Sequence, residues 1–420
     1  MQTNLAPEYR DTRDGREADA ILRTCVHCGF CNATCPTYQL LGDELDGPRG
    51  RIYLIKEMLE GGAVTASTQQ HLDRCLTCRN CETTCPSGVQ YGRLVDIGRS
   101  LVEAKVGRTP TEAAQRWTLR RALLSPTFFG GALAMGRAVR SWLPREVADR
   151  IPRGEGAGAW PAPRHARQML VMEGCVQPRL KPNIDAAAAR VLDRIGITPL
   201  RVAGAGCCGA LSHHLTADEE ARATVRKNID AWWPLVQRGL EAIVVTASGC
   251  GVMVKDYGHF LAHDAAYAAK AKKVADLARD PIEIVTAEWK KIAPQIAMDQ
   301  GPQRIAFHSP CTLQHGMKIR GEVEEILLAI GHSLLPVADT HLCCGSAGTY
   351  SVLQPALANV LKANKLKALE AARPDVLVTA NIGCLTHLQS GTQTPVRHWI
   401  ELLDTRMFSA APGLKARSIP

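Results

Sequence analysis

Residues 25–36 read CVHCGFCNATCP, and residues 75–86 read CLTCRNCETTCP. Both stretches follow one pattern, C-x2-C-x2-C-x3-C-P, in which three cysteines spaced three apart are followed by a fourth cysteine and a proline. This is the spacing of thiolates that bind a [4Fe–4S] cluster. Because the pattern occurs twice in one short stretch, it predicts a protein that carries electrons between two neighbouring clusters.

The fourth cysteine of each stretch is expected to bind the other cluster. Three cysteines three apart wrap a tight turn around one cubane, whereas the fourth stands further along the chain, just before a proline. In two-cluster proteins this cysteine ligates the second cluster. We therefore predict two [4Fe–4S] clusters, the first bound by Cys25, Cys28, Cys31 and Cys85, and the second by Cys35, Cys75, Cys78 and Cys81.

Zinc and disulfides are weaker explanations of these cysteines. Zinc sites use paired C-x2-C ligands with wider gaps between the pairs, and they do not need a third cysteine followed by a proline. The first 19 residues are polar and charged, so we expect no signal peptide. Sixteen cysteines in a long chain without one indicate metal binding in a reducing compartment rather than disulfides.

The composition excludes several classes of protein. A chain of 420 residues with 46% hydrophobic residues supports two or three folded domains. It has no run of 18 apolar residues, so no membrane span is predicted. Aromatic residues are only 5%, which argues against nucleic-acid binding despite the net charge of +9. An acidic partner or an anionic lipid surface suits that charge better.

The N-terminal part is predicted to be helical. Residues 51–60 carry apolar residues at mostly helical spacing, and residues 94–106 form a second such segment that ends at Gly107. Strand patterns are missing, so we expect a helical two-cluster ferredoxin domain over residues 1–107. Arg49 and Arg51 are expected to donate hydrogen bonds near a cluster, or else to form a loop salt bridge.

Residues 108–167 are expected to form a basic helical connector and a linker. Nine arginines stand between Arg108 and Arg153, against three acidic residues. They alternate with apolar residues, namely Trp117, Phe128, Phe129, Leu133 and Trp142. We expect this apolar stripe to pack on the neighbouring domains. The alternative is a basic amphipathic helix that lies on a membrane surface.

The rest of the chain contains an internal repeat. Cys175 and the pair Cys207–Cys208 recur 136 positions later (311 − 175, 343 − 207) as Cys311 and the pair Cys343–Cys344. A glycine follows each pair, and a fourth cysteine, Cys250 or Cys384, follows a similar V-T-A stretch. Repeats of this length indicate two copies of one structural unit. We place them at residues 168–300 and 301–408, followed by a tail at 409–420.

Each repeat is predicted to be an α/β unit. Short apolar runs at 168–172, 243–245, 304–307 and 376–378 end just before a cysteine, and helical segments lie between them. Ligands of parallel α/β folds collect at the carboxyl ends of the strands. The four cysteines of each repeat should therefore converge, provided that the glycine after each Cys-Cys pair allows a tight turn.

These cysteines are candidate ligands for further iron–sulfur clusters or zinc. A third hypothesis is a redox-active pair of thiols that switches between dithiol and disulfide. The two sets are Cys175, Cys207, Cys208 and Cys250, and Cys311, Cys343, Cys344 and Cys384. Five nearby histidines are weaker candidates for ligands or proton relays: His213, His214, His308, His315 and His341.

The chain resembles the iron–sulfur subunits of bacterial glycolate oxidase over nearly its whole length. The resemblance lies in residues 25–31 (CVHCGFC), 42–51 (GDELDGPRGR) and 342–350 (LCCGSAGTY). It implies an electron-transfer subunit beside FAD-binding partners that oxidise glycolate, and usually D-lactate, to pass electrons toward a quinone-linked respiratory acceptor. It also implies peripheral attachment to the cytoplasmic side of the inner membrane, and it makes the eight N-terminal cysteines [4Fe–4S] ligands.

Related subunits occur in anaerobic glycerol-3-phosphate dehydrogenase, lactate-utilisation complexes and heterodisulfide reductase. In the last of these, each repeat ends in C-x-x-C, whereas here Ala247 and Asn381 replace the first of those cysteines. Each repeat thus offers four thiolates instead of five. Alternative functions are a thiol–disulfide reductase, the equivalent subunit of a glycerol-3-phosphate or lactate dehydrogenase, and a scaffold with structural clusters. No Gly-rich dinucleotide motif follows a strand, so we expect neither FAD nor NAD on this chain.

Overall fold

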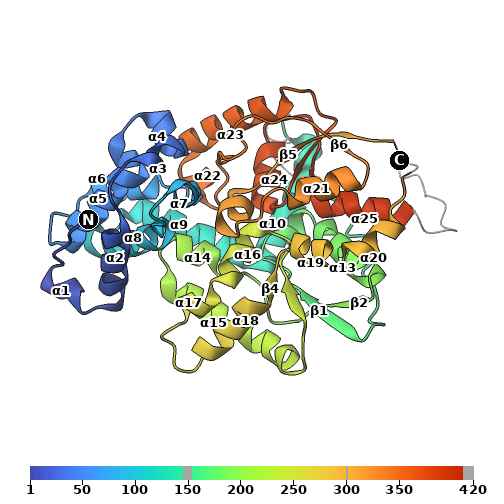
Figure 1. Ribbon diagram of the computed structural model, residues 1–420, viewed down its shortest axis with the longest axis horizontal. Coiled ribbons are helices and arrows are strands. Elements are labelled where there is room, and N and C mark those ends of the chain that lie inside the picture. The colour runs from blue at the N-terminus through green and yellow to red at the C-terminus, as the bar shows by residue number, and fades with distance from the viewer. Residues whose placement is uncertain (145–153, 299–300, 410–420) are drawn as a thin grey trace.

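The computed structural model describes residues 1–144, 154–298 and 301–409. In these residues the chain forms a helical N-terminal domain, a helical connector and two α/β repeats (Figure 1). The N-terminal domain lies at one end of the molecule and contacts both repeats. Of the predicted tail, residues 409–420, only Ser409 is among the described residues.

The N-terminal domain is helical, as predicted. The two predicted helices start three residues earlier than the apolar pattern indicates, because Pro48 supplies a good first helical residue in one and Tyr91 is buried in the other. Leu22, Ile55 and Leu94 are among the residues of its core. Its elements are α1 (Pro7–Arg10), α2 (Arg13–Thr24), α3 (Phe30–Ala33), α4 (Pro36–Leu41), η1 (Glu44–Asp46), α5 (Pro48–Leu59), α6 (Ala66–Asp73), α7 (Asn80–Thr84) and α8 (Tyr91–Val106).

The first repeat contains a four-stranded parallel sheet in the order β2-β1-β3-β4. The predicted strands at 168–172 and 243–245 are β1 and β3, and the two edge strands were not predicted. Its elements are β1 (Arg167–Val171), α12 (Gln177–Leu180), α13 (Asn183–Arg194), β2 (Ile197–Leu200), α14 (Ala210–His214), α15 (Asp218–Gln237), β3 (Ala242–Val244), α16 (Ser248–Lys255), α17 (Tyr257–Phe260), α18 (Ala268–Leu277), β4 (Ala278–Arg279), α19 (Pro281–Ala287), α20 (Trp289–Ile292) and η3 (Ala293–Gln295).

The second repeat has the same topology, with a parallel sheet in the order β6-β5-β7-β8. The prediction of two α/β repeats is therefore confirmed. The elements of this repeat are β5 (Arg304–His308), η4 (Thr312–Gly316), α21 (Glu322–Ala329), β6 (Ser333–Leu334), α22 (Tyr350–Leu353), α23 (Pro355–Glu370), β7 (Val376–Thr379), α24 (Ile382–Gln389), β8 (Val396–His398) and α25 (Trp399–Ser409).

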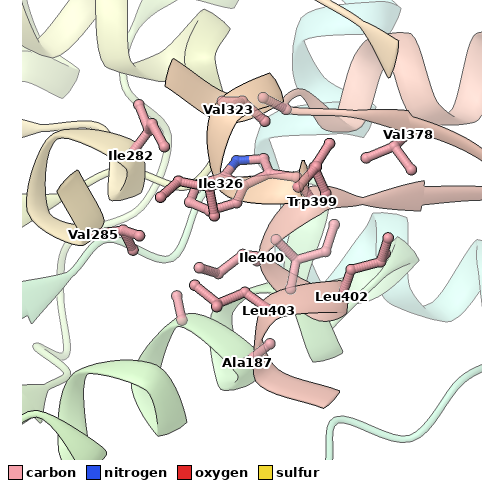
Figure 2. Packing of buried hydrophobic residues seen from close by; sticks show 14 of the residues in the cluster. Ala187, Ile282, Val285, Val323, Ile326, Val378, Trp399, Ile400, Leu402 and Leu403 are labelled. Carbon is pink, nitrogen blue, oxygen red and sulfur yellow. The ribbon is translucent and has the colours of Figure 1, made fainter. Parts of the chain in front are cut away.

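The two repeats share one hydrophobic core. The helix after the fourth strand of each repeat packs on the first long helix of the other, so that α25 contacts α13 and α19 contacts α21. Figure 2 shows Trp399 and Leu403 of α25 among Ala187 of α13 and Ile326 of α21. Arg190 and Asp404 form an ion pair of 2.7 Å across the same contact. This exchange of helices fixes the two sheets relative to each other.

The connector contains α9 (Pro110–Leu124), α10 (Pro126–Val139) and the short turn η2 (Arg140–Trp142). It is helical as predicted, but its apolar side chains do not enter a core. Trp142 is 85% exposed, Met135 67% and Phe128 62%. The expected packing of the apolar stripe is therefore wrong, because α10 rests on α9 and α12 without burying any of its described side chains.

Among the described helices, none combines the length and the apolar character that a membrane span requires. Arg145, Arg150 and Arg153 of the predicted basic segment lie outside the described residues.

Each Cys-Cys-Gly turn depends on its glycine, as predicted. Gly209 and Gly345 have φ of +94° and +88°, the left-handed region that only glycine adopts freely. Their N–H groups each lie 3.4 Å from the Sγ of the first cysteine of the pair. A Cβ on Gly345 would lie 2.6 Å from the carbonyl oxygen of Ala358. The turn thus needs glycine for both its dihedral angles and its close packing.

We expect Gly345→Ala to lower the stability of the chain by about 2–4 kcal/mol, because it combines left-handed strain with overpacking. Gly321→Ala is the matched control, since Gly321 has φ of +92° but open space around it. It should cost only about 1–2 kcal/mol. Thermal unfolding of oxygen-protected protein measures both. Equal losses in the two variants would contradict the role of packing at the turn.

Candidate metal centres

The first predicted set of N-terminal cysteines surrounds one cavity. Cys25, Cys28 and Cys31 come from the loop before α3 and from α3 itself, and Cys85 comes from the end of α7. Pro48, Ile52 and Val89 complete the apolar wall of this cavity. The four thiols thus come together from two stretches 50 residues apart in the chain, in the arrangement that the exchanged fourth cysteine requires.

The second set surrounds a neighbouring cavity. Cys75, Cys78 and Cys81 line it together with Cys35, and Cys81 also borders the first cavity. Soft, closely spaced thiolates in an apolar surrounding suit iron–sulfur clusters. The residues of both cavities therefore fit [4Fe–4S] clusters, although the assignment of each thiol as a ligand stays a prediction.

The two motifs have the same backbone conformation. Within each motif, the residues two and four positions after the first cysteine are left-handed, with φ of +59° at His27, +87° at Gly29, +53° at Thr77 and +59° at Arg79. The turn directs the N–H of His27 to Cys25 Sγ and that of Thr77 to Cys75 Sγ, each at 3.4 Å. Non-glycine residues adopt such angles only where the surroundings require it. The strain is consistent with a loop shaped to present thiolates to a cluster.

A buried cation lies beside the second cavity. Arg51 is 1% exposed, and its guanidinium donates to the carbonyl of His71 at 2.7 Å and pairs with Asp46 at 3.3 Å. It also donates to Thr37 Oγ1, which lies 3.3 Å from Cys35 Sγ. Burial raises the pKa of Cys35, and the positive charge of Arg51 opposes that rise. Of the two predicted arginines, Arg51 is thus the one buried beside a cysteine of the second predicted set.

Arg49 instead forms a partly exposed ion pair with Glu44, at 2.6 Å. Its guanidinium lies over Gly29, where a Cβ would meet Nη1 at 2.6 Å. It therefore flanks the loop of the first motif and corresponds to the alternative of a loop salt bridge.

Burial favours the protonated form of several of these thiols. Burial raises the pKa of Cys31 to about 11, and it also raises the pKa of Cys25 and Cys81. Clusters bind thiolates, so loading these sites must release protons.

The four cysteines of the first repeat also converge. Cys175 interacts with Cys207, Cys207 with Cys208, and Cys208 with Cys250. They lie at the carboxyl ends of β1 and β3 and in the turn before α14, where the α/β fold collects ligands. Only Cys208 of this set is buried; the other three are half-buried.

The second repeat brings its own four cysteines together, and all of them are buried. Cys311 interacts with Cys343, Cys343 with Cys344, and Cys344 with Cys384. In addition, the thiol of Cys311 contacts that of Cys78 in the N-terminal domain. This contact between domains, about 230 residues apart in sequence, was not predicted, because spacing within a motif carries no information about how domains dock.

The replaced cysteine positions have distinct surroundings. Asn381 donates from Nδ2 to Cys384 Sγ at 3.5 Å and accepts from the N–H of Gly249 at 3.3 Å. Ala247 is buried at the lining of the first repeat's cavity. Asn381 therefore links the cysteine sites of the two repeats instead of supplying a fifth thiolate.

Of the candidate histidines, His213 and His315 have protein partners. Burial by itself would lower the pKa of His213, but Asp96 and Asp218 outweigh it and raise this pKa to about 10. His315 bonds Thr83 at 3.1 Å and the carbonyl of His341 at 3.0 Å. These two histidines join the N-terminal domain to the repeats.

His308 differs from them. Neither of its ring nitrogens has a hydrogen-bond partner among the described residues, and burial lowers its pKa to about 3. Lys365, which sequence reasoning missed, is also buried near the thiols of the second repeat; its Nζ donates to the carbonyl of Asp339 at 2.7 Å. Helical periodicity gave no signal for it, because a lysine at that position reads as a surface residue.

A helical domain with two neighbouring thiol-lined cavities, joined to two cysteine-rich α/β repeats, defines an iron–sulfur electron-transfer protein. Family models agree: a 4Fe-4S dicluster domain matches residues 21–89, and a cysteine-rich domain matches residues 169–255 and 305–389. The chain is 55% identical to the glycolate oxidase iron-sulfur subunit of Escherichia coli (strain K12), over 96% of this chain and 98% of that one. It belongs to the family of glycolate oxidase iron–sulfur subunits.

More distant relatives extend the similarity. The probable glycolate oxidase iron-sulfur subunit of Bacillus subtilis (strain 168) is 28% identical, over 92% of this chain and 91% of that one. Lactate utilization protein A of Anoxybacillus flavithermus is 24% identical, over 55% of this chain and 97% of its own length. The resemblance to glycolate oxidase subunits stated above is thus confirmed.

We expect Arg51→Gln to lower the reduction potential of the second cluster, because a nearby cation stabilises the more negative reduced state. It should also cost about 3–5 kcal/mol of stability, since it breaks a buried ion pair. Redox titration followed by EPR and thermal unfolding measure the two effects. Arg51→Lys keeps the charge and should keep a potential close to that of the wild type.

Arg49→Gln is the matched control for this prediction. Its partly exposed pair with Glu44 should contribute at most about 1 kcal/mol, and the potential of the second cluster should not move. A shift of that potential in Arg49→Gln as large as in Arg51→Gln would contradict the special position of Arg51.

Proposed function

We propose that this chain is the electron-transfer subunit of a complex that oxidises glycolate to glyoxylate. The observation that carries the proposal is the 55% identity to a glycolate oxidase iron-sulfur subunit over nearly the whole of both chains. In this proposal the chain binds two [4Fe–4S] clusters through its eight N-terminal cysteines. A separate FAD-binding subunit removes the electrons from the substrate, and a quinone-linked acceptor of the respiratory chain receives them.

The arrangement of the thiols supports this role. When bound, [4Fe–4S] clusters take up and release one electron at a time. The protein holds the two N-terminal cavities side by side, so that Cys81 borders both of them. The contact between Cys78 and Cys311 continues the row of thiols into the second repeat. The chain thus offers a path for electrons through its interior, while the chemistry on the substrate takes place on the partner.

Glycolate-driven reduction tests the proposal. In the oxygen-protected complex with its FAD-binding partner, glycolate should produce the EPR signals of reduced [4Fe–4S] clusters. Cys78→Ser should slow the reduction of a quinone analogue by at least about tenfold, because it removes a ligand of the second cluster. A dye that takes electrons directly from the flavin serves as the control and should be reduced at the wild-type rate.

Different outcomes of this experiment favour other functions. Clusters that stay oxidised with glycolate but are reduced by D-lactate or glycerol-3-phosphate would assign the chain to another dehydrogenase. Reduction of a disulfide by the isolated chain would support a thiol–disulfide reductase. An unchanged rate with the quinone analogue in Cys78→Ser would make the clusters structural.

We further propose that the chain attaches peripherally to the cytoplasmic side of the inner membrane through a connector surface. This surface consists of exposed apolar residues of the connector, namely Trp117, Phe128, Met135 and Trp142. Arg121 lies 5.7 Å from the Trp117 ring, and Arg137 and Arg140 belong to the same segment. Aromatic residues combined with arginines are typical of surfaces that insert shallowly into anionic lipid.

Vesicle binding tests this attachment. The full chain should sediment with vesicles that contain phosphatidylglycerol, and binding should weaken with added salt. The double variant Phe128→Ser/Trp142→Ser should bind about tenfold more weakly, a change of about 1.4 kcal/mol. The control Leu328→Ser removes a similarly exposed apolar side chain of α21 and should bind like the wild type. Equal binding of the double variant and the control would refute the connector surface.

A further inference from the structure

The two repeats have the same topology and four cysteines each, and one difference between their sites concerns a histidine. His308 ends β5 three residues before Cys311, and the residue three before Cys175 in the first repeat is Met172. His308 is only 2% exposed. The difference therefore concerns a buried residue at the carboxyl end of a central strand, where ligands of the fold collect.

The ring of His308 lacks partners in the part of the chain that the structure describes. Both Nδ1 and Nε2 are buried without a hydrogen bond. Buried polar groups are almost always paired, because an unpaired one loses its hydrogen bonds to water without replacement. A histidine that the fold buries at this cost is therefore expected to have a partner of another kind, such as a metal ion.

The ring is placed among thiols. One ligand atom each of His308, Cys344 and Cys384 lies within 4.8 Å of the other two, a separation short enough for all three to bind one metal centre. His315 and His341 of the same repeat do not take part in this group, and the ring of His315 has two protein partners. His308 is thus distinguished from its neighbours by geometry as well as by its missing partners.

A second observation, the buried cation Lys365, indicates that anionic groups are favourable at this site. Lys365 is 3% exposed, lies near the thiols of Cys311, Cys343 and Cys344, and has a backbone carbonyl as its hydrogen-bond partner. A buried ammonium is costly without a compensating anion. In the first repeat, the buried polar residue of the long helix α15 is the neutral Asn228. The carboxylate of Asp339, which also favours the charged form of Lys365, is exposed, whereas thiolates that bind metal at the second site would supply anionic charge inside the protein.

We propose that the second repeat holds an iron–sulfur centre in which His308 is an imidazole ligand beside Cys344 and Cys384. Iron–sulfur is favoured over zinc because Cys311 of the same site contacts Cys78 of the second N-terminal cavity, which places the centre next to an electron donor. The centre differs from any that the first repeat could hold, since Met172 offers no imidazole. This inference deepens the electron-transfer function proposed above and rests on it.

The consequence for electron transfer follows from the ligand. Replacing a thiolate by a neutral imidazole lowers the negative charge on an iron–sulfur centre and raises its reduction potential. An electron that leaves the second N-terminal cluster would oxidise that cluster and reduce this centre by one unit each. In the series of sites that starts at the N-terminal cavities, the centre of the second repeat would therefore have a raised reduction potential and accept electrons. The first repeat lacks the imidazole that would raise a potential in this way.

The test uses the full chain, purified without oxygen. Iron, zinc and sulfide are counted, Mössbauer spectra of ⁵⁷Fe-enriched protein give the number of centres, and pulsed EPR during stepwise reduction detects nitrogen bound to iron. We expect iron beyond that of the two N-terminal clusters and a strong ¹⁴N coupling. Labelling with ¹⁵N-histidine should convert this coupling to that of ¹⁵N without any change of sequence.

Two variants assign the nitrogen. His308→Cys keeps a ligand at the position, so it should retain the iron, lose the nitrogen coupling and lower the potential of this centre, while the signals of the N-terminal clusters remain. His315→Gln is the matched control and should leave the coupling unchanged. Three results would each overturn the proposal: a nitrogen coupling that survives in His308→Cys, no nitrogen coupling in the wild type, or zinc in place of the additional iron. These readouts do not involve glycolate, so they stand apart from a failure of the proposed substrate.

Discussion

The contact between Cys78 and Cys311 connects the two halves of the molecule, and the docking of the N-terminal domain makes it possible. Polar contacts surround it on the side of the second repeat. Asn80 donates to the carbonyl of His341 at 3.1 Å, Tyr350 donates to the carbonyl of Arg74 at 3.1 Å, and Thr83 bonds His315. Electron transfer falls steeply with distance, so two thiols in contact need domains that cannot move apart.

The first repeat holds the same domain from another side, mainly through charges. Arg93 of α8 pairs with Asp256, Glu17 of α2 with His259 at 2.8 Å, and Asp96 with His213 at 3.4 Å. These groups are partly shielded from water, which strengthens their attraction relative to surface pairs. Because the two repeats share one hydrophobic core, the N-terminal domain docks on a single packed unit and not on two independent domains.

Much of this organisation could be predicted from the sequence. Cysteine spacing is a direct consequence of how a short turn wraps a cluster, so both N-terminal motifs and both sets of four were identifiable. The central strands β1, β3, β5 and β7 were predicted because they are buried apolar runs before a cysteine. Of the four edge strands, β4 and β6 could not be predicted, because they contain two residues each, too few for any periodic pattern.

Other features depend on contacts that no local pattern encodes. The connector carries an apolar stripe, but a stripe shows only that a face is apolar, not that a neighbour covers it. The missing hydrogen-bond partners of the His308 ring could not be predicted for the same reason, because they depend on which residues the fold brings near the ring. Histidine is common in many settings, and only the fold shows that His315 is satisfied by Thr83 while His308 is not.

The positions of the buried cations support one view of how the molecule is stabilised. Arg51 lies beside Cys35 and Cys75, and Lys365 beside the thiols of the second repeat, whereas the first repeat has the neutral Asn228 in its interior. A buried cation opposes folding until an anion accompanies it. Arg51 is paired with the buried carboxylate of Asp46. The carboxylate near Lys365, that of Asp339, is exposed, and the buried thiols around Lys365 become anionic when metal replaces their protons. Metal loading and folding should therefore be most tightly coupled in the second repeat, which is also the one whose four cysteines are all closed off from solvent.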